Sequence, residues 1–210
     1  METARIADLL APFLAGGSSL TSHQLEQIST YLRLLLRWTA RTNLTAVRKP
    51  EEIVTRHFGE SLFAAAHFLR PDQALSAIDV GSGAGFPGLP LKIYAPNIRL
   101  TLIESNRKKA TFLKEVMRAL ALQGVEVFTG RAEDFSSTAA LVTLRAVERY
   151  EEVLPVAASL VAPGGRLALL IGSAQAERTT KLLPGFTWER TLLVPRSAAR
   201  VIMVGKTPEV

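Results

Sequence analysis

The chain has 210 residues, a length that accommodates one main domain with a small additional layer. It contains no cysteine, which excludes disulfide bonds, thiolate zinc sites, iron–sulfur clusters and cysteine nucleophiles. The three histidines are scattered without metal-ligand spacing, so we expect no metal site. The net charge of +6 suits a polyanionic partner such as nucleic acid.

The N-terminal stretch does not have the pattern of a targeting segment. Residues 6–15 are mostly apolar, but Asp8 interrupts them and only Arg5 precedes them, which makes a poor secretory signal. No apolar run approaches the roughly 18 residues that a membrane-spanning helix needs. We therefore expect a cytoplasmic protein with no membrane partner.

Before about residue 74 the apolar pattern is helical. Apolar residues recur at steps of three and four at Leu25, Ile28, Leu32, Leu35 and Leu36. Thr21 or Ser22 is a suitable cap for this helix, and a second helical stretch follows Pro50. We expect residues 1–74 to form a helical segment packed on a main domain that spans residues 75–210.

From Leu75 short β-branched runs alternate with helical ones, which is typical of a parallel sheet with crossover helices. The predicted strands are residues 75–80, 98–104, 125–129, 141–145 and 166–172. A helical stripe between the second and third strands ends at Gly124, a predicted left-handed cap. Residues 186–194 and 200–204 are joined by too few residues for a helical crossover, so they predict an antiparallel hairpin. The expected fold is α/β, with about seven strands in a mostly parallel sheet that ends in this hairpin.

The first predicted strand ends at Asp79 and runs into a loop rich in glycine. Gly81, Gly83, Gly85 and Gly88 allow the backbone to turn tightly and to approach a ligand closely. A sheet of this kind binds ligands at the carboxyl ends of its strands. We therefore expect a cofactor at this loop.

Two cofactor classes fit the loop. Its last three glycines satisfy G-x-G-x-x-G, and Glu104 at the end of the second strand suits ribose hydroxyls, so a nicotinamide dinucleotide and an oxidoreductase are one alternative. S-adenosylmethionine (AdoMet) is favoured by the position of Asp79, by the Ala132-Glu133-Asp134 run after the third strand, and by the terminal hairpin.

Residues 79–90, Asp-Val-Gly-Ser-Gly-Ala-Gly-Phe-Pro-Gly-Leu-Pro, closely resemble the cofactor loop of the RsmG (GidB) family of 16S rRNA guanine-N7 methyltransferases. Further motifs match in order along most of the chain: Trp38, Asn43 to Val47, Arg56-His57-Phe58, Ser61-Leu62, Glu104 to Lys109, Gly130 to Glu133, Arg145-Ala146-Val147 and Pro163 to Arg166. The chain departs from the family at Glu60, where aspartate is frequent, at Leu144, where serine is frequent, and slightly at the closing Val204-Gly205-Lys206.

The resemblance implies a class I, Rossmann-like methyltransferase fold, AdoMet as cofactor with S-adenosylhomocysteine (AdoHcy) as product, and methylation of N7 of one guanosine in 16S rRNA. The partner is then 16S rRNA or the small ribosomal subunit, and we expect a monomer. Arg145 is the expected catalytic residue. The expected cofactor-binding residues are Asp79, Gly81, Ser82, Gly83, Gly85, Phe86, Glu104, Ser105, Asn106, Ala132, Glu133 and Arg145. Of these, Glu104 and Ser105 are expected at the ribose, and Ala132 and Glu133 at the adenine.

The end of the fourth predicted strand agrees with this chemistry. Residues 142–147 contain no carboxylate, no Asn-Pro-Pro-aromatic run and no cysteine, which disfavours methylation of exocyclic amines, ribose hydroxyls and carbon 5 of pyrimidines. N7 of guanine carries a free lone pair, so in-line transfer to it needs no general base and depends on orientation. The sequence leaves open whether Arg145 contacts O6, a phosphate or the methionine carboxylate.

Other residues have more than one interpretation. Arg107-Lys108-Lys109 and a basic set in the helical part (Arg33, Arg37, Arg41, Arg48, Lys49 and Arg56) are candidate RNA surfaces or solvated charges. Trp38, Phe63 and Phe112 are expected in the core, whereas Phe86 is expected to wall the cofactor. The role of His57 stays open. A further alternative function is an RNA-binding assembly protein that keeps the fold without activity.

Overall fold

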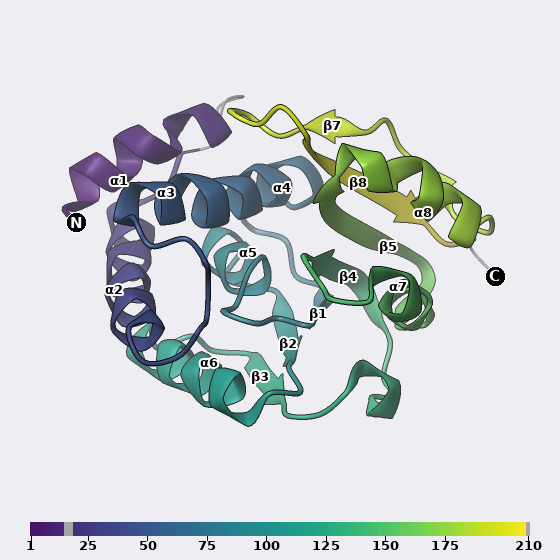
Figure 1. Ribbon diagram of the computed structural model, residues 1–210, viewed down its shortest axis with the longest axis horizontal. Helices are drawn as coiled ribbons and strands as arrows, with labels where there is room; N and C mark the ends of the chain where they lie inside the picture. The colour runs from purple at the N-terminus through teal and green to yellow at the C-terminus, as the bar shows by residue number, and fades with distance from the viewer. Residues whose placement is uncertain (15–18, 209–210) are drawn as a thin grey trace.

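The computed structural model describes residues 1–14 and 19–208; Ala15, the end of the first apolar stretch, and residues 209–210, the end of the expected main domain, lie outside that range. The core of the fold is an eight-stranded sheet with the order β3-β2-β1-β4-β5-β8-β6, in which β7 also pairs with β8 (Figure 1). The parallel strands are β1 (Ser76–Val80), β2 (Arg99–Ile103), β3 (Val125–Phe128), β4 (Ala139–Arg145) and β5 (Val161–Gly172).

The sheet ends in antiparallel strands, as predicted. β8 (Arg200–Lys206) lies antiparallel to β5 and also pairs with β6 (Thr187–Trp188) and β7 (Leu192–Leu193). The prediction of one strand over residues 186–194 was wrong, because the exposed polar residues 189–191 separate two short strands. β5 also begins at Val161, earlier than predicted, and continues through a Pro-Gly-Gly run that is more typical of a turn.

Helices form over residues 25–36, after Pro50 and between the second and third strands, as predicted. In the first part of the chain they are α1 (Thr3–Leu10), η1 (Ala11–Phe13), α2 (Ser22–Thr39), α3 (Pro50–Ile53), the π-helical turn η2 (Val54–Gly59) and α4 (Glu60–Phe68). Between the strands lie α5 (Gly88–Tyr94), α6 (Arg107–Ala119), η3 (Ala132–Asp134), α7 (Tyr150–Ser159), η4 (Ser173–Gln175) and α8 (Ala176–Leu182). No helix in the described ranges is long and apolar enough to cross a membrane.

The predicted caps of two helices, α2 and α6, can be compared with the structure. Thr21 caps α2 as predicted, because its side chain accepts from the Gln24 amide at 3.2 Å while Gln24 Oε1 accepts from the Thr21 amide at 2.8 Å. The prediction that Gly124 ends α6 was wrong. α6 ends at Ala119, and the left-handed residue that follows it is Ala121, with φ +50°. Gly124 is also left-handed, but it lies in the turn before β3.

Two clusters of buried apolar side chains cover the two faces of the sheet. Ala77 and Leu141 belong to one cluster and Ile78 and Val142 to the other, since successive strand residues point to opposite faces. The first cluster includes the apolar faces of α1 to α6, and the second includes α7. Figure 1 shows α1 to α4 around α5 and α6, with α7 on the other side of the strands. The N-terminal helices therefore share one continuous core with this face of the sheet.

Candidate functional site

A cavity of about 640 Å³ lies at the carboxyl ends of β1 to β4. This volume falls in the range of roughly 300 to 1,000 Å³ that is typical of ligand and cofactor sites. The loop after β1 forms one wall, and the segments after β2, β3 and β4 form most of the others, together with Leu44, Thr45 and His57 of the N-terminal segment. All of the predicted cofactor-binding residues except Asp79 and Gly85 line it. We call it the cofactor cavity.

The backbone of the glycine loop takes conformations that favour glycine. Gly81 has φ +66° and Gly83 has φ +56°, both in the left-handed region. A Cβ at Gly81 would lie 2.9 Å from Val147 Cγ1. The absence of a side chain at Gly81 therefore allows the loop to pack against the segment after β4. A Cβ at Gly83 would have Gly81 O as its nearest neighbour, at 3.8 Å, so this position borders open space. The loop therefore presents bare backbone to the cavity at Gly83.

Asp79 lies beneath the loop and not on the cavity wall. Its buried carboxylate accepts hydrogen bonds from Thr143 Oγ1 at 2.7 Å and from the Gly88 amide at 3.3 Å. Burial raises the pKa of Asp79 from 3.8 to about 6, although the hydrogen bonds oppose the shift. Asp79 thus ties β1 to β4 and to the start of α5.

Gly85, the other predicted residue away from the cavity, is a packing position. It has φ +91°, and a Cβ there would lie 2.6 Å from Leu89 Cδ1 and would also collide with the Tyr31 hydroxyl. Tyr31 in turn donates a hydrogen bond to the Ala84 carbonyl from α2. Gly85 therefore allows α2 to approach the loop closely.

Glu104 connects the glycine loop to the start of α6. Its Oε2 accepts from the Gly83 amide at 2.8 Å, and its Oε1 accepts from the Asn106 amide at 2.7 Å. The Asn106 side chain accepts from the Lys108 and Lys109 amides and so caps α6. The carboxylate of Glu104 is consequently fixed at the cavity wall by two backbone donors, close to the point where a ribose was expected.

Arg145, the last residue of β4, is held by the π-helical turn and by the first residue of α4. Its Nη2 donates to the Arg56 carbonyl at 2.8 Å, to Glu60 Oε2 at 2.9 Å and to His57 Nδ1 at 3.1 Å. The Arg145 side chain is only 8% exposed, and burial lowers its pKa while the Glu60 carboxylate opposes that shift. π-Helical turns occur frequently at functional sites, and this one collects three acceptors around a single guanidinium group.

His57 is a neutral member of this group. A guanidinium group only donates, so His57 Nδ1 accepts, and its Nε2 then carries the proton and donates to Thr45 Oγ1 at 2.7 Å. Burial, followed by the charges of nearby arginines, lowers the pKa of His57 to about 3. The imidazole stacks on Phe86, with ring centroids 5.0 Å apart, and Phe86 stacks on Tyr31 at 5.3 Å. Phe86 therefore both lines the cavity and packs in the core.

Sequence reasoning missed the role of Glu60 and Arg200. The Glu60 carboxylate is buried and accepts two hydrogen bonds from Arg200 Nη1, at 2.9 and 2.7 Å, besides the one from Arg145. The signals in the sequence are a carboxylate at the start of a mostly apolar helix and its place at a position where the family frequently has aspartate. Nothing in the sequence around Arg200 indicates that the start of β8 approaches α4.

The predicted basic residues have different surroundings. Lys109 lines the cofactor cavity, together with Arg131 and Arg149. Arg48 donates to the Thr39 carbonyl at 2.9 Å and so fixes its own loop. The remaining predicted basic residues are exposed: Arg33, Arg37, Arg41, Lys49, Arg56, Arg107 and Lys108. Phe112 is fully buried, and Trp38 and Phe63 pack against the core as predicted.

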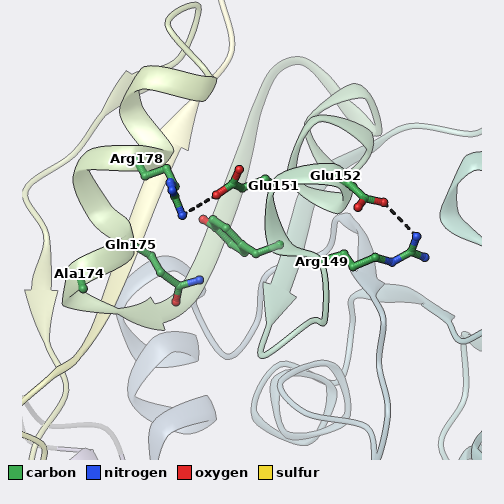
Figure 2. Close-up of a pocket in the computed structure, with 7 residues that line it drawn as sticks. Arg149, Glu151, Glu152, Ala174, Gln175 and Arg178 are labelled. Atoms are coloured by element: carbon green, nitrogen blue, oxygen red, sulfur yellow. Dashed lines mark hydrogen bonds and ion pairs between the residues drawn. The ribbon is translucent and has the colours of Figure 1, made fainter.

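Two smaller cavities lie beyond Arg145. One, of about 340 Å³, shares Arg145, Ala146 and Val147 with the cofactor cavity; we call it the inner cavity. The other, of about 360 Å³, lies between α7 and the η4–α8 segment and is called the outer cavity (Figure 2). Figure 2 shows an ion pair on each side of it, Arg178–Glu151 at 2.5 Å and Arg149–Glu152 at 3.0 Å. In the described ranges, no group of three or more His, Asp or Glu side chains is arranged to hold a metal ion.

Known proteins resemble this chain in sequence and in fold. The family model GidB, described as rRNA small subunit methyltransferase G, matches residues 24–189. A "Ribosomal RNA small subunit methyltransferase G" from Streptococcus pyogenes serotype M12 is 37% identical over 164 residues, which cover 75% of this chain and 69% of that protein.

Two solved structures share the fold at low identity. A ribosomal protein L11 methylase from Lactobacillus delbrueckii subsp. bulgaricus is 12% identical with a TM-score of 0.62, covering 72% of this chain and 79% of that one. M. jannaschii TYW2 in complex with AdoMet is 17% identical with a TM-score of 0.60, covering 73% of this chain and 76% of that one. These likenesses confirm the predicted class I methyltransferase fold.

Proposed function

Because this chain belongs to the GidB family, the small-subunit rRNA methyltransferases G, we propose that it transfers a methyl group from AdoMet to N7 of one guanosine in 16S rRNA. Family membership supports a methyltransferase that acts on rRNA of the small subunit. The acceptor atom, the direct in-line mechanism and the identity of the cofactor are our own proposals. We further propose that the enzyme is monomeric and cytoplasmic and acts on 16S rRNA or on the small subunit. The net charge of +6 agrees with an rRNA partner.

The residues of the cofactor cavity fit AdoMet. Gly83 leaves bare backbone at the wall, and Glu104 presents a fixed carboxylate beside it. We assign Glu104 and Ser105 to the ribose hydroxyls, Ala132 and Glu133 to the adenine, and Phe86 to the wall near Arg145; all of these residues line the cavity. Bound AdoMet supplies an electrophilic methyl group.

The hydrogen bonds around Arg145 are the main support for N7 as the methyl acceptor. Two groups there could accept a proton, and both are engaged: His57 Nδ1 accepts from Arg145, and the buried Glu60 carboxylate accepts from two arginines. An acceptor that must lose a proton before attack therefore finds no ready base at this point. N7 of guanine has a free lone pair, so the protein only needs to orient the base and to exclude water, which contributes up to about 7 to 11 kcal/mol in favourable cases.

We also propose residues 1–74 as an accessory segment of the active site and residues 75–210 as the methyltransferase domain. Arg56, His57 and Glu60 all belong to the N-terminal segment and all contact Arg145 of β4. The segment thereby sets the orientation of the predicted catalytic arginine.

The decisive experiment is methyl transfer with labelled AdoMet to naked 16S rRNA and to assembled small subunits, followed by nucleoside analysis. We expect label in 7-methylguanosine alone. Label in another nucleoside contradicts the N7 assignment. Calorimetry with AdoHcy and with NAD tests the cofactor, and binding of NAD alone would favour an oxidoreductase. Salt-dependent rRNA binding without any transfer would instead favour an assembly protein.

A further inference from the structure

The inner cavity begins where the cofactor cavity ends. Its shared wall is Arg145, Ala146 and Val147, the segment that follows β4. Ala146 has φ +49°, a left-handed conformation that non-glycine residues adopt rarely and that is often found at functional sites. The opposite walls come from Tyr150 of α7, Gln175 of η4 and Arg200 of β8. A group placed in the inner cavity is thus adjacent to the end of the cofactor cavity near Arg145.

Tyr150 forms a fixed aromatic wall of this cavity. Thr179 Oγ1 donates its only proton to the Gln175 carbonyl at 2.8 Å, so the Tyr150 hydroxyl must donate to Thr179 Oγ1, 2.7 Å away. The hydrogen bond holds the phenol oxygen on α8. Tyr150 lines both the inner and the outer cavity. Aromatic faces of this kind stack unpaired RNA bases, and the stacking tolerates any base.

Arg200 supplies hydrogen-bond donors at one side of the inner cavity. Its Nη1 is held by both oxygens of the buried Glu60, and its side chain remains 35% exposed. Its Nε and Nη2 groups have no hydrogen-bond partner within residues 1–14 and 19–208 and are free to donate. A cationic donor favours guanine, whose O6 is an acceptor, over adenine, whose N6 is a donor. A single contact to O6 leaves the neighbouring N7 lone pair free for reaction.

We propose that the inner cavity takes the guanine base that accepts the methyl group, with Tyr150 stacking on its face and Arg200, positioned by Glu60, donating to O6. The inference rests on the proposed function and adds a site for the acceptor base to it. The ligand class is an unpaired purine nucleotide of RNA with a carbonyl oxygen at position 6.

The first test separates the base pocket from the cofactor cavity. Tyr150→Ala should lower kcat/KM for 16S rRNA by roughly tenfold or more at saturating AdoMet, while the Kd for AdoHcy stays within about twofold. Tyr150→Phe keeps the ring and should recover most of the transfer. Phe63→Ala, which removes a half-buried ring outside all three cavities, is the matched control and should retain wild-type kcat/KM.

The second test concerns the edge of the base and compares the wild-type protein with Arg200→Met. A 16S rRNA assembled with 2-aminopurine at the methylated position lacks O6 but keeps N7. The wild-type enzyme should methylate it roughly tenfold more slowly, and Arg200→Met should lose a similar factor on normal rRNA. Because both changes remove the same contact, combining them should cost little more than either alone.

The outcomes distinguish the two proposals. Unchanged transfer by Tyr150→Ala, a parallel loss of AdoHcy binding, or additive effects of Arg200→Met and 2-aminopurine would overturn the base pocket while leaving the methyltransferase intact. If Tyr150→Ala fails to fold, the comparison of 2-aminopurine with guanosine in wild-type protein still decides the role of O6. Wild-type protein that binds no AdoHcy and transfers no methyl group to 16S rRNA would overturn the proposed function itself.

Discussion

His57 Nδ1 accepts a hydrogen bond from Arg145 Nη2 across 3.1 Å, which joins the π-helical turn to the end of β4. The contact is possible only with a neutral imidazole whose proton is on Nε2, and Thr45 Oγ1 accepts that proton at 2.7 Å. Protonation of His57 would place a cation against a buried guanidinium group. Burial, and then the charges of Arg145 and the other nearby arginines, lower the pKa of His57 to about 3.

This contact predicts a pH dependence of stability. The unfolded chain binds a proton at His57 below about pH 6.5, whereas the folded chain does so only near pH 3. Between these values the unfolded state binds more protons, so the His57 contribution to the free energy of unfolding falls as the pH falls. As the pH is lowered from 7 to 5, the free energy of unfolding of His57→Gln should therefore rise by up to about 2 kcal/mol relative to that of the wild type. Urea denaturation at each pH measures this difference.

Asp79 changes the stability with pH in the opposite direction to His57. The effect of His57 is therefore measured as the difference between His57→Gln and the wild type, and not from the wild-type curve alone. The pKa of Asp79, about 6 in the folded chain, lies above its ordinary 3.8, so its contribution to stability rises as the pH falls between these values. The two contributions partly cancel in the wild-type curve. His67→Gln, at an exposed imidazole, is the control. A constant difference between His57→Gln and wild type across this range would show that His57 is not held neutral.

Glu60→Gln should destabilise the protein strongly. The carboxylate is buried between Arg145 and Arg200, and removing one partner of a buried ion pair typically costs about 3 to 5 kcal/mol. Glu52→Gln is the matched control, because Glu52 pairs with Lys49 at 3.6 Å on the surface and should cost less than about 1 kcal/mol. Urea denaturation of both variants checks the prediction. A similar small cost for both would mean that the buried pair adds little to stability.

The sequence predicted those parts of the fold that depend on local residue patterns. Apolar periodicity located α2, the helical stretch after Pro50, α6 and the parallel strands, but not α7 or α8, and the glycine spacing located the loop that borders the cofactor cavity. It failed where polar residues interrupt a pattern, as in the split of residues 186–194, and where apolar packing continues past a helix end, as at Leu120 after α6. In the first case a run of exposed polar residues sets the boundary, and in the second the burial of Leu120 continues the apolar pattern beyond the end of the helix.

The electrostatic part of the site could not be predicted in the same way. Arg145 was identified from the sequence, but its acceptors lie 85 to 89 residues earlier, and Arg200 lies 140 residues after Glu60. Pairing over such separations depends on which helix packs over which strand end. The π-helical geometry of residues 54–59, which points Arg56 O and His57 Nδ1 toward Arg145, has no signature in the sequence that we recognise.

Gly83→Val should abolish AdoHcy binding. The substitution forces a β-branched residue into a left-handed conformation at φ +56° and fills open space at the wall of the cofactor cavity. Gly185→Val is the control, since a Cβ there has no neighbour within 4 Å and its φ is not left-handed. Isothermal calorimetry with AdoHcy checks both variants. Wild-type affinity in Gly83→Val would place the cofactor elsewhere.

Arg145→Ala should reduce methyl transfer far more than it reduces the folded population. Glu60 keeps both hydrogen bonds from Arg200 in this variant, so its carboxylate is not left unpaired. The loss of stability should therefore stay near 1 to 3 kcal/mol, which leaves a domain of ordinary stability almost entirely folded. Transfer should fall roughly 100-fold or more, because Arg145 forms part of the wall that the cofactor cavity and the inner cavity share, and its loss disturbs the relative position of methyl donor and acceptor. Urea denaturation and single-turnover transfer to 16S rRNA measure the two quantities on the same protein. If transfer falls only in proportion to the unfolded fraction, Arg145 is a structural residue and the assignment of this end of the cavity to catalysis is wrong.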